Sequence, residues 1–417
     1  MAPSGKSKRY ILLGIVLALV VIGMVMVQTR NRPERPLDRK SKSSPSAASA
    51  PERRSPRSKH ADDVGVTASP PGEAANPDAA ITALIQKSLE DFRNNHDPAQ
   101  ARQILRLFRE SLRQAPEDGA AAAIVDFLKT GADAPTGLPF SVGPDGMMAT
   151  VPTLRLALLD LLPSLDPMVA LEIARELMDQ QTSPDEYALS LRNLAWNDLD
   201  GDLHNELTER FLELLKTPWL NQPSAGFLES FDVAVEAGGS RMFDALVSLV
   251  HGTIAKPNAA VSQATYLSLD RMIVRDRTLL TTEFSKDPTW TDFAPQQRAS
   301  MLSRLDITQP EQRDLFLRYL SSIPHPAGEL DYFAKIFPNQ NYLAGYHLVT
   351  AAEATPGIAD VMAADAQVLK ELDTLPALLT GDAAAAVLKI KQRLAKSAPA
   401  ASPPADTNGV KGKGSSD

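Results

Sequence analysis

The sequence predicts an all-α protein of 417 residues with an N-terminal single transmembrane helix. Three features lead to this prediction: one uncharged apolar run, prolines that directly follow helix-capping residues, and apolar side chains that recur at helical spacing. The chain has no cysteine, which excludes thiol nucleophiles, thiolate metal ligands and disulfides. We therefore expect an anchor, a linker and a helical body.

The predicted anchor is the run from Tyr10 to Val27. It carries no charge and follows a basic tail, residues 1–9. As a helix it would be about 27 Å long, close to the roughly 30 Å hydrocarbon core of a membrane. The run is longer than the apolar region of a secretory signal, and no small-residue cleavage site follows it. We expect a retained, single-pass signal anchor.

The orientation of the anchor depends on its flanks and on the compartment. Basic residues lie on both sides of the run, and a count of basic residues alone would place the body in the cytoplasm. Long domains are translocated largely regardless of flanking charge, and a cysteine-free body suits an oxidising compartment. We expect an extracytoplasmic body, periplasmic in a bacterial-type cell envelope, with a cytoplasmic body as the alternative.

Two segments are expected to be disordered. Residues 28–77 contain eight Pro, eight Ser, ten Lys or Arg and no Phe, Trp or Tyr. Such a composition cannot bury enough apolar surface to offset the entropy lost on ordering. These residues should form a Pro/Ser/Arg-rich linker between anchor and body. Residues 397–417, rich in Pro, Ala, Gly, Ser and Lys, should form a disordered tail.

The body, residues 78–396, is acidic. It holds 28 of the Lys and Arg residues and 43 of the Asp and Glu residues, a net charge of −15. Nucleic-acid-binding surfaces present clustered Lys and Arg to phosphates, so we expect no nucleic-acid partner. A body of this length exceeds what one compact core usually supports, which favours two subdomains or one stacked array.

Capping residues followed by proline mark several helix starts in the body. Four such pairs are Asn76-Pro77, Asp97-Pro98, Asp166-Pro167 and Ser183-Pro184. Ser183 and Glu186 also have the spacing of a capping box. Further on, Leu207, Phe211 and Leu214 share one face of a helix whose other faces are charged. These signals predict helices through most of the body.

Helix starts near residues 152, 167, 184, 203, 223, 241 and 257 would give a two-helix unit of about 35 residues. After a first group of helices in residues 78–131, residues 152–396 should then form an array of helical hairpins. In architecture, residues 78–396 resemble a degenerate HEAT-like α-solenoid, which implies an extended binding surface. An irregularly packed all-α domain is the alternative.

Residues 132–151 interrupt the helical pattern with three Pro and three Gly. The sequence Gly143-Pro144-Asp145-Gly146 predicts a turn that could fold this loop into a short hairpin lying on the helices. A loop of this length is either functional or a structural crossover between two groups of helices, and the sequence leaves both readings open.

Tyrosines are concentrated in one stretch of the body, and we interpret them as a candidate interaction surface. The four are Tyr319, Tyr332, Tyr342 and Tyr346, with Phe333 and Phe337 among them. Tyrosine combines an apolar ring with a polar tip and is enriched at recognition surfaces. Packing in the core between short helices is the alternative.

A basic ridge is the second candidate interaction surface. Its members recur at helical spacing: Arg102, Arg106, Arg109 and Arg113. Guanidinium groups bind carboxylates and phosphates through paired hydrogen bonds, so the ridge could hold an anionic groove or lipid headgroups. The alternative is a solvated face whose charges are balanced by Glu90, Asp91 and Glu110.

The sequence contains no motif for a catalytic, cofactor or metal site, and we expect none. We expect a membrane-anchored scaffold that binds a protein partner or associates with itself. One alternative is an enzyme or small-ligand-binding protein whose site combines Asp, Glu, Tyr and Arg residues without a local motif. Another is an envelope spacer or polymer-binding element, in which the linker matters more than the body.

Overall fold

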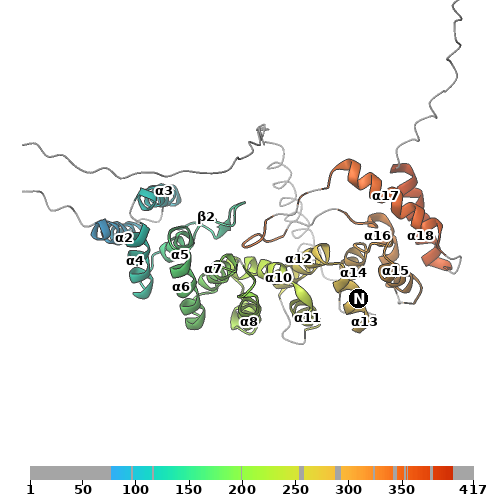
Figure 1. Ribbon diagram of the computed structural model, residues 1–417, viewed down its shortest axis with the longest axis horizontal. Coiled ribbons are helices and arrows are strands. Elements are labelled where there is room, and N and C mark those ends of the chain that lie inside the picture. Colours follow the sequence, from blue (N-terminus) through green and yellow to red (C-terminus); the bar gives the residue numbers. More distant parts are fainter. Residues whose placement is uncertain are drawn as a thin grey trace, which may run out of the picture. The chain divides into compact units, whose positions relative to one another are not determined.

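The computed structural model describes residues 77–397 apart from residues 95–96, 115–116, 199, 253–257, 287–292, 323–324, 341–344, 352–353, 355 and 376–378 (Figure 1). The described residues fold into helices and one small sheet, which confirms the predicted all-α class. None of the helices in these ranges is both long enough and apolar enough to span a bilayer. The predicted anchor, residues 10–27, lies outside the described residues, as do residues 1–9, 28–76 and 398–417.

Three helices open the body: α2 (Pro77–Asn94), α3 (Pro98–Gln114) and α4 (Glu117–Lys129). Helices α2 and α3 begin at the two prolines expected to start them. The Asp97 carboxylate accepts a hydrogen bond from the backbone N–H of Ala99 (3.0 Å) in the first turn of α3. The apolar faces of the three helices meet in one core that includes Phe92, Phe108 and Ile124.

The loop after α4 folds into the expected hairpin. Its strands, β1 (Ser141–Val142) and β2 (Met148–Thr150), pair antiparallel. Gly146 at the tip has φ 78°, and a Cβ atom there would lie 2.8 Å from the Trp196 ring. Because only glycine tolerates both conditions, the tip can approach the helices this closely.

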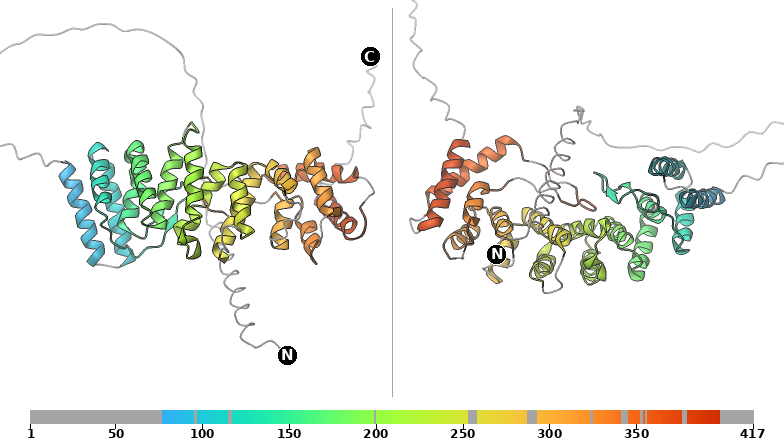
Figure 2. Two further views of the ribbon diagram at one scale, coloured as in Figure 1. Left: turned by 90° about the horizontal axis from the view of Figure 1, so that it is seen from below. Right: turned by 180° about the vertical axis from the view of Figure 1, so that it is seen from behind.

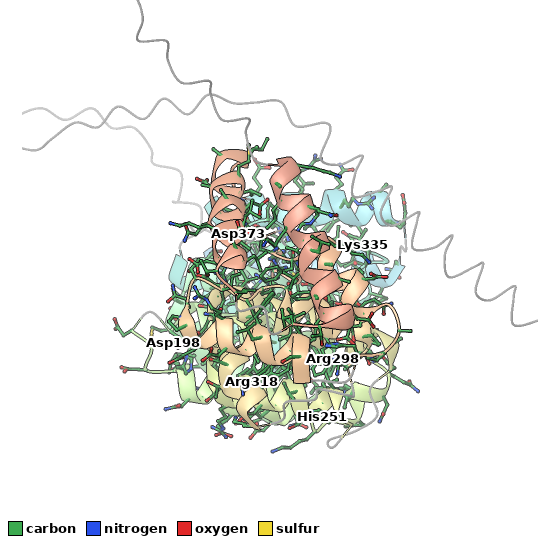
Figure 3. The ribbon with its side chains drawn as sticks, turned by 90° about the vertical axis from the view of Figure 1, so that its right-hand side faces the viewer. Asp198, His251, Arg298, Arg318, Lys335 and Asp373 are labelled. Atoms are coloured by element: carbon green, nitrogen blue, oxygen red, sulfur yellow. The ribbon has the colours of Figure 1, made fainter. Side chains whose placement is uncertain are left out.

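The rest of the body is a succession of helices packed in chain order (Figure 1). They are α5 (Leu154–Leu165), α6 (Pro167–Gln180), α7 (Pro184–Trp196), α8 (His204–Leu214), the 3-10 helix η1 (Pro218–Asn221), α9 (Ala225–Glu229), α10 (Asp232–Ala237), α11 (Gly239–Val250), α12 (Ala259–Arg275), α13 (Thr278–Lys286), α14 (Pro295–Leu302), α15 (Pro310–Ser322), α16 (Glu329–Ile336), α17 (Ile358–Asp373) and α18 (Gly381–Ser397). Helices that are not consecutive in the chain also meet, in the series α5, α7, α9, α12, α14 and α16. Helix α18 packs against both α16 and α17 (Figure 3).

Capping side chains start α6 and α7 where the sequence places them. The Asp166 carboxylate accepts two backbone hydrogen bonds of 3.0 Å in the first turn of α6. At α7 the Ser183 hydroxyl accepts from the Glu186 N–H (3.5 Å). The Glu186 carboxylate does not complete a capping box, because it is buried against the Arg155 guanidinium (2.7 Å).

Helix α5 begins two residues later than expected. Its cap is Thr153, whose hydroxyl accepts a hydrogen bond from the N–H of Leu156 (3.4 Å). Thr153 also forms an isolated antiparallel bridge with Pro135, and the N–H of Thr136 donates to the carbonyl of Pro152 (2.8 Å). This pairing keeps the chain extended up to the cap and ties the two ends of the hairpin loop together.

Within the described residues, five buried arginine–carboxylate pairs join helices that are next but one in the chain. Arg155–Glu186 (2.7 Å) and Arg192–Asp160 (2.6 Å) join α5 to α7, Arg271–Asp232 (2.6 Å) joins α10 to α12, Arg304–Asp270 (2.8 Å) joins the turn that directly follows α14 to α12, and Arg298–Glu329 (2.6 Å) joins α14 to α16. The partners stand 31 to 39 residues apart. The spacing equals one step of two helices, so each pair sets the register between successive steps.

A segment that follows α16 runs back across the body (Figures 1 and 2). We call residues 345–351 the return segment. Leu348 within it is fully buried in the same apolar cluster as α2, α3 and α5. The Asp232 carboxylate at the start of α10 accepts hydrogen bonds from the N–H groups of Val349 and Thr350 (2.7 Å each). The return segment therefore connects helices from both halves of the body.

Replacing Asp160 by Asn should destabilise the body by about 3–5 kcal/mol, because it removes the carboxylate from a guanidinium that is fully buried. The matched control is Asp244→Asn, which breaks an exposed pair with Lys286 (2.8 Å) and should cost less than about 1 kcal/mol. The measurement is equilibrium urea unfolding of both variants. Equal losses would contradict the structural role assigned to the buried pairs.

Candidate functional site

Three arginines of the predicted basic ridge line one cleft. Arg102, Arg106 and Arg109 lie on the side of α3 that faces the hairpin loop, and the cleft between them has a volume of about 510 Å³. Apolar side chains, including Leu105 of α3 and Leu138 of the loop, form its floor. We call this feature the arginine cleft. Its charged rim comes from α3, and its apolar floor comes from both α3 and the hairpin loop.

Arg109 differs from its two neighbours because it holds the cleft together. Its guanidinium donates to the carbonyl of Met148 in β2 (3.0 Å) and to the carboxylate of Asp160 in α5 (3.2 Å). The side chain is 26% exposed, and its Nε–H is buried without an acceptor in the described part of the chain. Arg109 thus ties α3 to the hairpin and to α5. The side chain of Arg113 lies outside the described residues.

The carboxylate of Asp160 serves two guanidinium groups. It accepts from Arg109 (3.2 Å) and from Arg192 (2.6 Å), and also from the backbone N–H of Met148 (3.0 Å). Arg192 is fully buried, stacks at 4.3 Å on the Trp196 ring and donates to the carbonyl of Gly146 (3.0 Å). Burial lowers the pKa of Arg192, although Asp160 acts in the opposite direction. Asp160 thus shares its negative charge between the guanidinium groups of Arg109 and Arg192.

Arg102 and Arg106 are exposed at the rim of the cleft. Among the described residues, neither forms an ion pair with Glu90, Asp91 or Glu110, the residues expected to balance a solvated face. Glu110 lines the cleft beside them without approaching to ion-pair distance. Both guanidinium groups are therefore available to an anion from outside the chain.

The return segment forms a second polar centre. Arg271 of α12 donates to the Asp232 carboxylate (2.6 Å), to the carbonyl of Tyr346 (2.5 Å) and to the hydroxyl of Thr350 (2.6 Å). The Thr350 hydroxyl in turn donates to Asp232 (2.5 Å). Backbone and side chain of the return segment are thus bound by an arginine and a carboxylate that already pair with each other.

Glu229, at the end of α9, accepts a backbone hydrogen bond from His347 of the return segment. Burial raises the pKa of Glu229 to about 7, and the nearby Asp232 carboxylate acts in the same direction, while the hydrogen bond from His347 lowers it. The hydrogen bond from His347 indicates that Glu229 holds the return segment in place.

The described tyrosines of the predicted surface, Tyr319, Tyr332 and Tyr346, differ in exposure. Tyr319 is fully buried, its hydroxyl donates to Glu329 (2.9 Å), and it packs in the core. Tyr332 is 36% exposed on α16. Tyr346 is half-buried, and burial together with Glu229 raises the pKa of its hydroxyl. Tyr342 lies outside the described residues, and the recognition role of the exposed tyrosines stays a prediction.

Sequence reasoning missed the return segment and the buried ion pairs. A signal for the pairs was present, because Arg155 and Asp160 stand inside a leucine-rich helix that leaves little room for solvation. No local pattern marks the return segment, whose partners are up to 118 residues away. In the described ranges, no group of three or more His, Asp or Glu residues is arranged to hold a metal ion.

Comparison of the chain with protein-family models, with curated proteins and with solved structures finds no match. The function must therefore be argued from the site itself. The arginine cleft is the feature best suited to bind another molecule, because it combines exposed charge, an apolar floor and access from solvent.

Glu229→Gln should reduce the dependence of stability on pH. With a pKa raised from 4.5 to about 7, Glu229 in the folded chain holds a proton that the unfolded chain has released. The contribution of Glu229 to the free energy of unfolding therefore becomes less favourable as pH rises from about 4.5 to about 7, and it is constant above that range. At pH 8 the variant should melt several degrees higher than the wild type, and at pH 4.5 the two should melt together.

The melting temperature of the full-length chain, recorded by circular dichroism between pH 4.5 and 8, checks this expectation. Glu90→Gln, an exposed residue of α2, is the matched control and should follow the wild type at every pH. Parallel curves for wild type and Glu229→Gln would show that Glu229 is ionised in the folded chain.

Proposed function

We propose that the protein is a membrane-anchored scaffold whose helical body holds a protein partner beside the membrane. The anchor is the uncharged run from Tyr10 to Val27, and the Pro/Ser/Arg-rich residues 28–76 link it to the body. The body is extracytoplasmic and faces the periplasm of a bacterial-type cell. No catalytic group is required for this role.

The body is an array of helical hairpins of the HEAT-like kind. The observation that carries this proposal is the interval of 31 to 39 residues between buried arginines and the carboxylates that they bind on the next helix but one. An interval that recurs from α5 to α16 is typical of stacked two-helix units, in which each unit contacts its neighbours. Such stacks bind partners through extended surfaces rather than through one closed pocket.

Several large apolar side chains remain exposed on the body and suit a partner surface. Ile358 of α17 is 81% exposed, Leu388 of α18 is 56% exposed, and Leu107 of α3 is 52% exposed. Leu107 lies one residue from Arg106 of the arginine cleft. The end of the body that carries α3 therefore combines exposed apolar and basic groups, as protein-binding surfaces often do.

The absence of cysteine allows a direct test of the anchor and its orientation. Ser4→Cys lies before the proposed span and Ser46→Cys lies in the stalk, and each would be the sole thiol of the chain. In spheroplasts, a membrane-impermeant maleimide should label Ser46→Cys at once and Ser4→Cys only after the membrane is permeabilised. The reverse pattern would place the body in the cytoplasm, and recovery of the protein in the soluble fraction would exclude the anchor.

Crosslinking in intact cells tests the scaffold role. Full-length protein should yield a crosslinked partner in constant ratio to itself, and a chain that lacks residues 78–396 but keeps anchor and stalk should not. A chain that lacks residues 398–417 is the matched control and should retain the partner. If full-length protein and the chain without its body yield the same products, the scaffold proposal fails.

A further inference from the structure

We propose that the arginine cleft binds an acidic, amphipathic helix of a protein partner, with its carboxylates on Arg102 and Arg106 and an apolar side chain on the cleft floor. This inference rests on the scaffold role proposed above and names the chemistry of the partner. Its evidence is the spacing of the arginines, the charge balance around the cleft and the apolar floor.

The spacing of the two exposed arginines matches that of a helix. Arg102 and Arg106 are four residues apart on α3, so their Cα atoms are separated along the axis by about 6 Å. Two carboxylates four residues apart on a partner helix have the same separation. A residue between them on the same face, such as leucine three positions on from the first, would point at the floor.

The floor accepts such an apolar group. Leu105 and Leu138 line the cleft, and both are nearly buried, at 6% and 5% exposed, so only their tips border the open volume. A volume of about 510 Å³ holds a few side chains rather than a folded domain. The cleft therefore suits one turn or two of an amphipathic helix.

The charge around the cleft attracts an anion although the body as a whole is acidic. Arg102 and Arg106 have no ion-pair partner in the described part of the chain, and Arg109 shares the carboxylate of Asp160 with the buried Arg192. Glu110 is the acidic residue that lines the cleft. Even with Glu110 included, positive charges exceed negative ones, and a guanidinium binds a carboxylate through paired hydrogen bonds.

A protein segment fits these features better than an anionic membrane surface. The body carries a net charge of −15, so a negative membrane would repel most of it. The positive groups lie in a cleft bordered by the hairpin loop, whereas lipid headgroups are bound from a surface by basic patches spread over it. An acidic helix can enter the cleft and leave the acidic remainder of the body in solvent.

The test uses the full-length chain in neutral detergent and two fluorescent helix-forming peptides. One repeats the heptad Glu-Ala-Ala-Leu-Glu-Ala-Ala, and the other has Gln in place of each Glu. Fluorescence anisotropy should show that the Glu peptide binds more tightly than the Gln peptide. Arg102→Gln combined with Arg106→Gln should weaken the Glu peptide about tenfold and leave the Gln peptide unchanged.

The matched control removes two positive charges elsewhere on the body. Arg318→Gln combined with Lys335→Gln changes two exposed residues, on α15 and α16 (Figure 3). Neither residue lines the cleft. This control should bind the Glu peptide like the wild type. Equal weakening by both double variants, or equal binding of the two peptides to the wild type, would overturn the proposal. Both double variants should melt with the wild type, since the four side chains are exposed.

Two competition experiments test whether the cleft binds phosphate or lipid headgroups instead of an acidic helix. Inorganic phosphate should displace the Glu peptide no more than sodium chloride of equal ionic strength, and stronger displacement would assign the cleft to phosphate. Mixed micelles that contain phosphatidylglycerol should compete no better than mixed micelles that contain phosphatidylcholine. If they do compete, and the Arg102/Arg106 variant loses this effect, the cleft binds lipid headgroups and the proposal is wrong.

The crosslinking experiment in cells separates this inference from the scaffold role. The Arg102/Arg106 variant should lose the partner that depends on the body, and the Arg318/Lys335 control should keep it. If the variant keeps the partner, the scaffold stands and the cleft is not its binding site. If the full-length wild type yields no partner that depends on the body, the scaffold role itself fails.

Discussion

Burying charge inside a helical body imposes a constraint that the rest of this structure follows. Moving a carboxylate or a guanidinium out of water costs several kcal/mol, and the cost is offset only when both partners meet in good geometry. The pairs of this body are 2.6 to 2.8 Å long and almost fully buried. Compared with apolar side chains of the same size they add little stability. They restrict how helices such as α5 and α7 can be placed, because a shift along the axis would leave both charges unpaired.

The same chemistry holds segments that are not helices. Arg192 and Asp160 bind the hairpin tip and β2, and Arg271 and Asp232 bind the return segment. A guanidinium has more N–H donors, and a carboxylate more acceptor positions, than the ion pair itself uses. Backbone groups from distant parts of the chain bind to the remaining donors and acceptors. A loop that would otherwise expose its polar backbone is thus fixed by charges that already order the helices. The arginine cleft exists because Arg109 joins one of these pairs and so holds α3 against the hairpin.

The parts of this fold that could be predicted have local causes. Asp166 and Ser183 start α6 and α7 as capping residues do, Leu207 and Phe211 are buried together on one face of α8, and the glycine-rich turn closes a hairpin. Each signal acts within a few residues, so the sequence displays it directly. The architecture beyond the helices depends on contacts that no short window contains.

The candidate site shows where local reasoning stops. The spacing of Arg102 and Arg106 predicts a shared face, and both lie there. Arg109 follows Arg106 by three residues and lines the same cleft, but its guanidinium pairs with Asp160, 51 residues away. Glu186 leaves its capping position for Arg155, and Tyr319 is buried with its hydroxyl on Glu329. In each case a buried partner of opposite charge or a buried acceptor outweighs the local preference, and only the tertiary structure reveals that partner.

The return segment gives this body an order of assembly. An array of stacked helices can fold as it leaves the ribosome, each step on the one before. Here the Asp232 carboxylate binds Thr350, which is synthesised 118 residues later, on the order of ten seconds at ordinary translation rates. During that interval Asp232 and the place of Leu348 remain open to water, beside helices that are already complete. The middle of the body is therefore completed only after α11 to α16 have been synthesised, by a segment that follows α16 in the chain.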